Sequence, residues 1–230
     1  MSARAFLTGG ASGIGRAIAT MLVSEGYRVA ISARAHDRAA TAAGEIGAEL
    51  GLACDVRSPE SVRDAVNCLL ESFGGLDLLV NNAGVAEFFN VDKTSEAVWA
   101  AMIDTNLSGT FRVTKACLPS LLDGGGMVIN VLSTAARTAF PGSSAYVASK
   151  FGQLGFAESL RAEYRDRGLR VVNILPGAVD TPIWDNIEGD WDRSKMLRPK
   201  DVAEVARTAL RAPAATLVEE IRLGPAGGAL

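Results

Sequence analysis

The stretch Thr8-Gly9-Gly10-Ala11-Ser12-Gly13-Ile14-Gly15 decides how this chain folds. It follows the apolar run Ala5–Leu7 and leads into helical periodicity from Ile14 to Glu25, which predicts a turn from a buried strand into a helix. Glycines stand where the backbone must turn and approach a ligand closely, and the amides of a helix N-terminus attract a pyrophosphate. The spacing Gly-x3-Gly-x-Gly departs from the GxGxxG fingerprint, so the stretch alone fits an ordinary tight turn equally well.

Strand-like and helix-like segments alternate over the whole chain. The short apolar runs lie at Ala5–Leu7, Val29–Ile31, Leu78–Val80, Met127–Val131, Val171–Leu175 and Leu217–Val218. Helical periodicity covers Ile14–Glu25, Arg38–Leu50, Pro59–Phe73, Ser95–Leu122, Ser144–Arg167 and Lys200–Leu210, with Gly26, Gly51 and Gly168 where helices should stop. This order predicts an α/β fold: a doubly wound, mostly parallel sheet in three α/β/α layers, one domain over residues 1–230.

Composition restricts the partners. The net charge is -3 and no run of Lys or Arg occurs, so neither nucleic acid nor an anionic membrane is an expected partner. Cys54, Cys68 and Cys117 are widely spaced, which predicts buried thiols and no metal site. The first residues hold no apolar segment long enough for a signal peptide or a bilayer span, so we expect a cytoplasmic protein with a small-molecule ligand.

Polar residues follow two of the predicted strands. Asn81-Asn82-Ala83-Gly84 ends one strand and Ser133 ends the next, at the carboxyl edge where open α/β sheets bind ligands. Tyr146 and Lys150 are four residues apart on a predicted helix, hence on one face. An ammonium beside a phenol lowers the pKa of the phenol from about 10, and such a phenol transfers protons near neutrality. A Tyr-x3-Lys pair also arises by chance, usually on a solvated face.

The end of the second predicted strand bears on cofactor choice. The sequence there is Ile31-Ser32-Ala33-Arg34, without the carboxylate that holds the ribose hydroxyls of NAD. Arg34 would pair with a 2′-phosphate, with His36 and Arg38 as helpers, so NADP(H) is the prediction and NAD(H) the alternative. A solvated basic loop is the other interpretation.

These motifs together resemble the short-chain dehydrogenase/reductase family, from Arg4 to about Leu223. The resemblance rests on the glycine stretch, Asn81-Asn82-Ala83-Gly84, Ser133, Tyr146 with Lys150, and Pro176-Gly177, all in order. It implies that Tyr146 is the general acid/base, that Ser133 binds the substrate oxygen and that Lys150 binds the nicotinamide ribose and tunes Tyr146. Asn106 matches the proton-relay asparagine of the family.

The resemblance also implies a cofactor site. Its members, beside Tyr146 and Lys150, are Gly9, Ser12, Gly13, Ile14, Gly15, Arg34, Asp55, Val56, Asn82, Ala83, Gly84, Pro176, Gly177, Val179 and Thr181. The glycine stretch is expected at the pyrophosphate, Arg34 at the adenosine ribose, and Asp55 with Val56 at the adenine. Ser12 stands where NADP-selective members often carry a basic residue, so only one of the two usual phosphate-binding cations is present.

The expected function is hydride transfer between NADP(H) and the carbonyl or alcohol carbon of a small organic substrate. By resemblance alone, we expect a homodimer or homotetramer. Two alternatives are a non-catalytic NAD(P)-binding sensor or scaffold of the same fold, and a sugar-nucleotide epimerase or dehydratase. The intact Ser133, Tyr146, Lys150 and Asn106 argue against the sensor. The epimerase needs a nucleotide-sugar domain for which the chain has no room.

The irregular stretch from Thr181 to Pro199 is the expected substrate-binding loop. Its Trp184 and Trp191 suit small or flat, fairly apolar carbonyl compounds, although packing within the loop explains them equally well. Further candidates for the lining of the substrate pocket are Phe88, Phe89 and Phe140.

Overall fold

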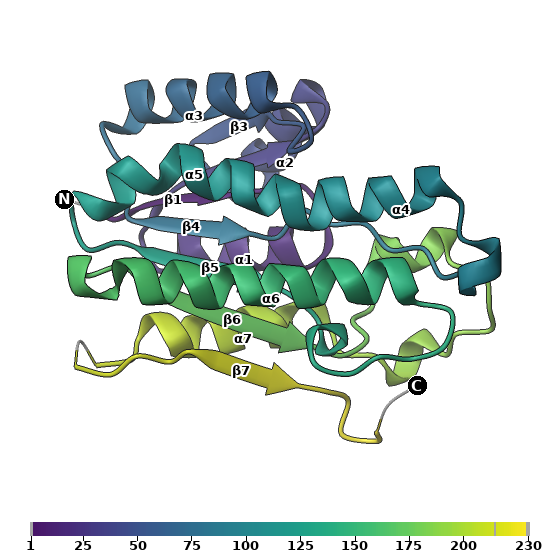
Figure 1. Ribbon diagram of the computed structural model, residues 1–230. Helices are drawn as coiled ribbons and strands as arrows, with labels where there is room; N and C mark the ends of the chain where they lie inside the picture. Colours follow the sequence, from purple (N-terminus) through teal and green to yellow (C-terminus); the bar gives the residue numbers. More distant parts are fainter. Residues whose placement is uncertain (1, 214, 229–230) are drawn as a thin grey trace.

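The computed structural model describes residues 2–213 and 215–228. These residues form one sheet of seven parallel strands in the order β3-β2-β1-β4-β5-β6-β7, which confirms the doubly wound α/β architecture (Figure 1). The apolar, β-branched central strands are buried on both faces, as parallel strands between two helical layers must be. The bounds are β1 Arg4–Leu7, β2 Arg28–Ala33, β3 Leu50–Ala53, β4 Leu78–Asn81, β5 Met127–Val131, β6 Arg170–Pro176 and β7 Glu220–Leu223.

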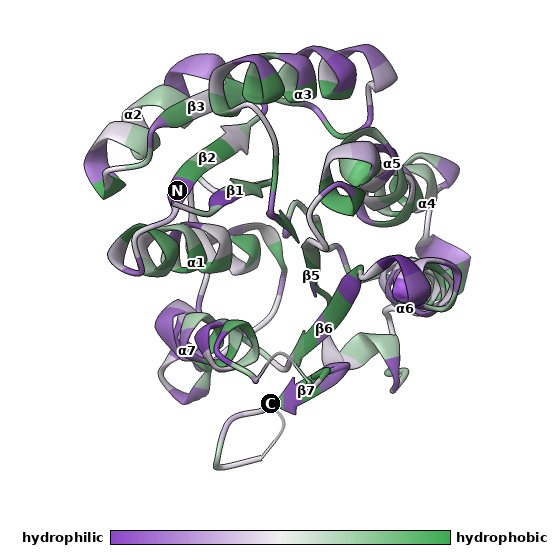
Figure 2. Cartoon of the chain, turned by 90° about the vertical axis from the view of Figure 1, so that its left-hand side faces the viewer, coloured by the Kyte–Doolittle hydropathy of each residue, from purple (hydrophilic) through white to green (hydrophobic). Residues whose placement is uncertain are grey.

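Helices cover both faces of the sheet, and each layer encloses a separate apolar core (Figure 2). One face carries α1 (Gly13–Ser24), α2 (His36–Ile46) and α7 (Pro199–Leu210); the other carries α3 (Pro59–Phe73), α5 (Gly109–Leu122) and α6 (Ser144–Tyr164). Successive strand residues point to opposite faces, so Leu7 and Val80 enter the first core while Phe6 and Leu79 enter the second.

Two boundaries predicted in the first half of the chain are wrong. The helix expected to reach Leu50 ends at Ile46, because Gly47 adopts a left-handed conformation (φ 75°) that terminates α2. Gly51, expected to stop that helix, lies inside β3, a strand that the sequence did not predict. The residues of β3 have no β-branched side chains, and the apolar pattern of the preceding helix continues through them, so the sequence did not indicate a strand there.

Other predicted elements are shifted or subdivided. The last strand, β7, begins at Glu220, three residues after the predicted start at Leu217. The predicted helix Ser95–Leu122 consists of α4 (Glu96–Met102), a π-helical segment Ile103–Ser108 and α5 in direct succession. The predicted start of α3 is confirmed, with Ser58 as the capping residue and Pro59 in the first turn.

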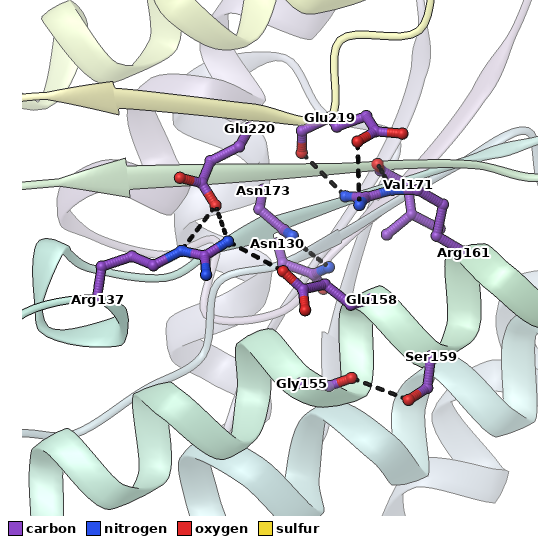
Figure 3. Close-up of polar contacts among 10 residues, drawn as sticks. All are labelled: Asn130, Arg137, Gly155, Glu158, Ser159, Arg161, Val171, Asn173, Glu219 and Glu220. Carbon is purple, nitrogen blue, oxygen red and sulfur yellow. Dashed lines mark hydrogen bonds and ion pairs between the residues drawn. The ribbon is translucent and has the colours of Figure 1, made fainter.

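The edge strand β7 is fastened to α6 by charged side chains (Figure 3). Arg137 contacts Glu220 of β7 and Glu158 of α6, each at 3.0 Å. Arg161 of α6 donates to the backbone carbonyl of Glu219 at 3.1 Å. Exposed charges on an edge strand also oppose pairing with a further strand.

A row of buried asparagines crosses three central strands. Asn81 donates to the Asn130 side chain and Asn130 donates to Asn173, both at 3.0 Å, the second bond being visible in Figure 3. The three residues are register partners on β4, β5 and β6, so the amide bonds link adjacent strands side by side. The Nδ2 of Asn81 also donates to Thr114 of α5 at 3.0 Å, which ties the sheet to the helix above it.

The cysteines agree only in part with the prediction of buried thiols. Cys54 and Cys117 are buried, and Cys68 is exposed. Burial raises the pKa of the Cys54 thiol to about 11 and also raises the pKa of Cys117, so both are protonated at neutral pH.

Candidate active site

The carboxyl edge of the sheet contains a reversal of strand order between β1 and β4. After β1 the chain passes through α1 to β2 on one side, and after β3 it returns through α3 to β4 on the other side. In open α/β sheets such a switch point leaves a crevice between two diverging connections. Here the two connections are the glycine stretch after β1 and the Asn82-Ala83-Gly84 stretch after β4.

The glycine stretch has a backbone that other residues would strain. Gly9 and Gly13 have φ of 63° and 53°, in the left-handed region. A Cβ on Gly15 would collide with the Gly9 carbonyl and the Asn82 amide, so the turn and α1 pack too closely for a side chain. Ser12 is the capping residue of α1, yet its side chain bonds none of the helix amides. The amides of the first turn are therefore available to an anionic group.

Asn82 and Thr8 hold this turn in shape. The Asn82 Nδ2 donates to the carbonyls of Thr8 at 3.1 Å and Gly9 at 3.0 Å. The Thr8 hydroxyl accepts from the backbone amides of Asn82 and Ala83, both at 3.1 Å. The Asn82 side chain thus joins the two connections. Thr8 belongs to the glycine stretch but was not among the residues predicted for the site.

Arg34 and Asp55 lie beyond the ends of β2 and β3. The Arg34 side chain is exposed and makes no hydrogen bond or ion pair with any residue in 2–213 or 215–228. Arg57, 2.6 Å from Asp55, lowers the pKa of that carboxyl, and the nearby Arg34 charge lowers it further. Val56 is buried against Gly109, where a Cβ would clash with it. Arg34 is thus an unpaired cation at this edge of the sheet.

The end of β6 approaches the glycine stretch from the other side. Pro176 is the last residue of β6, and the Gly177 amide donates to the Leu223 carbonyl at 2.8 Å. Val179 and Thr181 are buried. A Cβ on Gly13 would lie 3.1 Å from the Thr181 methyl group, so Thr181 borders the first turn of α1. The structure therefore brings these predicted site residues to one edge.

Ser133 and Tyr146 meet at the carboxyl end of β5. Ser133 caps the 3-10 turn Thr134–Ala136, and its Oγ accepts from the Ala135 amide at 3.1 Å. Burial raises the pKa of the Tyr146 phenol, and the neighbouring Ser133 hydroxyl lowers it by less. The lowered phenol pKa expected from an adjacent ammonium is thus wrong for this structure. Desolvation of the phenolate outweighs the effect of Ser133, and the phenol keeps its proton at neutral pH.

Lys150 lies one helical turn beyond Tyr146 and is buried, with 4% of its surface exposed. Its Nζ is 5.8 Å from the centre of the Tyr146 ring, so the two groups share one face of α6 as expected. Burial lowers the pKa of Lys150 to about 8. The Nζ donates to the Gln153 side-chain oxygen at 3.0 Å, a contact that the sequence analysis did not anticipate.

Asn106 is fully buried in the π-helical segment. Its amide group bonds the Val85 backbone in both directions, accepting at 2.9 Å and donating at 3.0 Å, and donates to Ser149 at 2.9 Å. Its backbone carbonyl accepts from the Thr110 hydroxyl at 2.8 Å. Short π-helical insertions are frequent at functional sites because they redirect carbonyl groups. Asn106 thus holds the connection after β4 against α6.

A cluster of aromatic rings lies on one side of the phenol and contacts it through Phe88. The Phe88 ring lies edge-on to three rings, those of Phe140 at 5.5 Å, Tyr146 at 5.7 Å and Trp184 at 6.3 Å between centroids. Trp184 in turn lies 5.0 Å from Trp191. Phe89, also expected to line the pocket, is 40% exposed and pairs with no ring among the described residues. The cluster of Phe88, Phe140, Tyr146, Trp184 and Trp191 is called the aromatic wall below.

The sequence missed two polar residues beside the site, Gln153 and Thr110. Gln153 is three residues after Lys150 on the same helix, a spacing that places two side chains on one face and was a usable signal. Thr110 gave no such signal, because it reaches the site only through the packing of α5 against α6.

No group of three or more His, Cys, Asp or Glu residues in 2–213 and 215–228 is arranged to hold a metal ion. Within the same residues, no helix is long and apolar enough to span a bilayer.

A doubly wound sheet with a glycine turn at its switch point defines the Rossmann class of α/β protein. The family model of the short chain dehydrogenases matches residues 3–191. The D-threitol dehydrogenase of Mycolicibacterium smegmatis is 41% identical over 195 residues, 81% of this chain and 75% of the relative. The chain therefore belongs to the short-chain dehydrogenase/reductase family of oxidoreductases, which confirms the resemblance.

Two solved structures show the same fold over almost their full length. The alcohol dehydrogenase of Thermococcus sibiricus, complexed with 5-hydroxy-NADP, has a TM-score of 0.91 and 33% identity, covering 100% of this chain and 99% of its own. The 3-ketoacyl-(acyl-carrier-protein) reductase of Brucella melitensis, complexed with NADH, has a TM-score of 0.89 and 27% identity, covering 97% of each chain. These similarities cover the whole of the edge described above.

Proposed function

We propose that this protein transfers hydride between NADP(H) and the carbonyl or alcohol carbon of a small apolar substrate, with Tyr146 as general acid/base. The observation that carries the proposal is the proximity of Ser133 and Tyr146 at the carboxyl edge of the sheet, where the Ser133 hydroxyl lies close enough to the phenol to lower its pKa. When a carbonyl oxygen between two hydroxyl donors becomes an alkoxide, the donors already point at it, so little free energy is needed to reorient them.

The residues at the switch point fit a dinucleotide. Positive φ at Gly9 and Gly13 and the unused amides of the first turn of α1 suit a pyrophosphate. The unpaired Arg34 suits the 2′-phosphate that distinguishes NADP from NAD. Both cofactor types occur among the relatives, as 5-hydroxy-NADP and NADH in the two solved structures. Arg34 is therefore the basis for preferring NADP(H), and NAD(H) remains the alternative.

The proposed roles in carbonyl reduction follow from the protonation states. The cofactor supplies the hydride when bound. Tyr146 holds its proton at neutral pH because its pKa is raised, so it donates that proton to the substrate oxygen as negative charge develops there. Ser133 orients the oxygen with a second hydrogen bond. The Lys150 ammonium then stabilises the phenolate left on Tyr146, within the distance given above.

The aromatic wall supports the expected substrate class of small or flat, apolar carbonyl compounds. The indole N–H of Trp184 donates to the Val179 carbonyl at 3.0 Å and that of Trp191 to the Glu188 carbonyl at 3.2 Å. Both tryptophans therefore present only apolar surface to a ligand. A flat apolar group beside Tyr146 would gain ring contacts and lose little hydration.

Replacement of Phe88 by alanine should weaken the binding of an aryl ketone because it removes the ring that contacts three others. We expect KM for such a ketone to rise about tenfold, the loss of one or two aromatic contacts, with kcat reduced less. Phe89→Ala is the matched control, since the neighbouring ring lies outside the aromatic wall. Equal KM values for the two variants would show that the aromatic wall is not part of the substrate site.

Apolar side chains on the outer face of α5 and α6 support the expected homo-oligomer. Phe111 of α5 and Phe151 of α6 are each 46% exposed, and Phe111 packs edge-on against Phe156 at 5.9 Å. Large rings left exposed on adjacent helices are typical of a subunit interface. This proposal places the contact between copies on these two helices and leaves the choice of dimer or tetramer open.

A charge placed on this surface should dissociate the oligomer. We expect Phe111→Glu to shift the mass measured by light scattering after gel filtration from an oligomer to a monomer, because the carboxylate would be buried without a partner. Val91→Glu is the control, since Val91 is 74% exposed and lies outside both helices. An oligomer that survives in Phe111→Glu would contradict this interface.

A measurement of cofactor binding distinguishes the proposed enzyme from a protein that binds no dinucleotide. We expect calorimetric titration to give a tighter complex with NADPH than with NADH, and turnover of at least one apolar carbonyl compound. Binding without turnover of any ketone, aldehyde, quinone or 3-oxoacyl thioester would favour the alternative, a dinucleotide-binding sensor. Absence of binding to both cofactors would contradict both functions.

A further inference from the structure

A chain of buried side chains links Lys150 to the π-helical segment. The Lys150 Nζ donates to the Gln153 Oε1 at 3.0 Å, and the Gln153 Nε2 donates to the Thr110 Oγ1 at 2.8 Å. The Thr110 hydroxyl donates to the Asn106 carbonyl at 2.8 Å. Gln153 is 1% exposed and Thr110 is 5% exposed, so these bonds are shielded from bulk solvent. The series is called the Gln153 chain below.

The two ends of the Gln153 chain fix the orientation of every group within it. The Asn106 carbonyl only accepts hydrogen bonds, so the Thr110 hydroxyl must donate to it and accept from the Gln153 NH2 group. The oxygen of the Gln153 amide must then face Lys150, and an ammonium can only donate. The chain is therefore fully satisfied when Lys150 is protonated. It is no proton wire to solvent, because it ends on a carbonyl that releases no proton.

We propose that Gln153 is a positioning residue that keeps the buried Lys150 side chain charged and in place beside Tyr146. The inference rests on the proposed function for its consequence in catalysis, and on the geometry alone for its effect on Lys150. A buried ammonium without a partner loses its hydration and is readily neutralised. A hydrogen bond from an ammonium to an amide oxygen offsets part of that loss, because bonds to charged groups are the stronger ones.

Lys150 receives no help from a carboxylate among the described residues. Burial alone accounts for the shift of its pKa to about 8. From the strand beneath it, the Val131 carbonyl lies 3.5 Å from the Nζ. From the connection after β4, Gly84 lies beside the Nζ: a Cβ added to it would lie 3.8 Å from the Nζ and 3.3 Å from the Asn106 Oδ1. Tyr146 is the titratable neighbour on its own helix. The Gln153 oxygen is thus the close acceptor that sets how stable the charged form is.

The sign of the effect follows from the charge. Lys150 is charged below its pKa, so activity that needs the ammonium is lost as the pH rises through about 8. Gln153→Leu removes the acceptor and should lower the pKa of Lys150 by about one unit or more. Gln153→Glu places a carboxylate at the same point and should raise it. The alkaline limb of the kcat/KM profile should move with the pKa in both variants.

Nuclear magnetic resonance of protein labelled with ¹³C at the lysine Cε measures this pKa without any turnover. Lysine occurs at positions 93, 115, 150, 195 and 200, and the four others are exposed. The Lys150 signal is identified by its loss in Lys150→Met. We expect its titration midpoint to fall in Gln153→Leu and to rise in Gln153→Glu. Unchanged midpoints in both variants would overturn the proposal.

A second pair of variants tests the same chain should Gln153→Leu fail to fold. Thr110→Val removes the hydroxyl that orients the Gln153 amide and should lower the Lys150 midpoint by a smaller amount. Thr114→Val is its control, one helical turn away, buried equally and bonded to Asn81 instead. Equal midpoints for these two variants would also contradict the proposal. A protein that reduces no carbonyl would refute the proposed function, whereas the Lys150 titration would still decide the role of Gln153.

Discussion

Tyr146→Phe should reduce kcat by about a thousandfold or more while the affinity for the cofactor stays within about twofold of the parent. The variant removes one oxygen atom and keeps the ring that packs against Phe88. General acid catalysis contributes about 10²- to 10⁴-fold, and the lost hydroxyl also leaves one donor fewer at the substrate oxygen. Steady-state assays with NADPH, combined with calorimetric titration of the cofactor, measure both quantities.

Ser133 provides the comparison for this variant. Ser133→Ala removes a hydrogen bond to the substrate oxygen without removing the proton donor, so its loss in kcat should be smaller than that of Tyr146→Phe. Turnover of Tyr146→Phe near the parental rate would show that another group supplies the proton. A parallel loss of cofactor affinity and of the melting temperature would instead indicate a structural defect.

Arg34→Asp should reverse the preference between the two cofactors. The substitution removes the main cation proposed for the 2′-phosphate and places a carboxylate where NAD-selective dinucleotide sites hold the ribose hydroxyls. We expect the ratio of kcat/KM for NADPH to that for NADH to fall about a hundredfold or more, because a charge-assisted contact is lost and a like-charge repulsion is added. Steady-state kinetics with each cofactor at a fixed carbonyl concentration gives this ratio.

Two further variants separate the causes of that change. Arg34→Ala removes the attraction without adding repulsion, so it should lower activity with NADPH and leave activity with NADH nearly unchanged. Arg165→Asp makes the same change of net charge in the turn that precedes β6, at the opposite edge of the sheet, and should alter neither. A cofactor ratio in Arg34→Asp equal to that of Arg165→Asp would exclude Arg34 as the selector.

Local sequence signals predicted those parts of the fold that local chemistry determines. The turn into α1 follows from glycines that adopt positive φ, and the start of α3 from Ser58 and Pro59. The strand β3 escaped prediction because Leu50-Gly51-Leu52-Ala53 is short and follows a helical pattern without a break in hydrophobicity. Gly47 was the usable signal for the end of α2, since its φ of 75° favours glycine.

The site was predicted as a set of residues, and its electrostatics were not. The spacing of Tyr146 and Lys150 placed both on one face of α6, and the structure has them there. The direction of the Tyr146 pKa depends on burial in the folded protein, which the spacing of residues in the sequence does not report. Gln153 reaches Thr110 across 43 residues of sequence, so their contact follows only from the packing of α5 on α6.

Transfer of deuterium tests the central claim most directly. The protein is incubated with NADPH carrying deuterium at the transferable position of the nicotinamide and with a panel of apolar ketones, and the alcohol products are analysed by mass spectrometry. We predict an alcohol with one deuterium on the former carbonyl carbon, formed by the parent and not by Tyr146→Phe. Tight binding of NADPH with no deuterated alcohol from any ketone of the panel would contradict the assignment of this site as a carbonyl reductase.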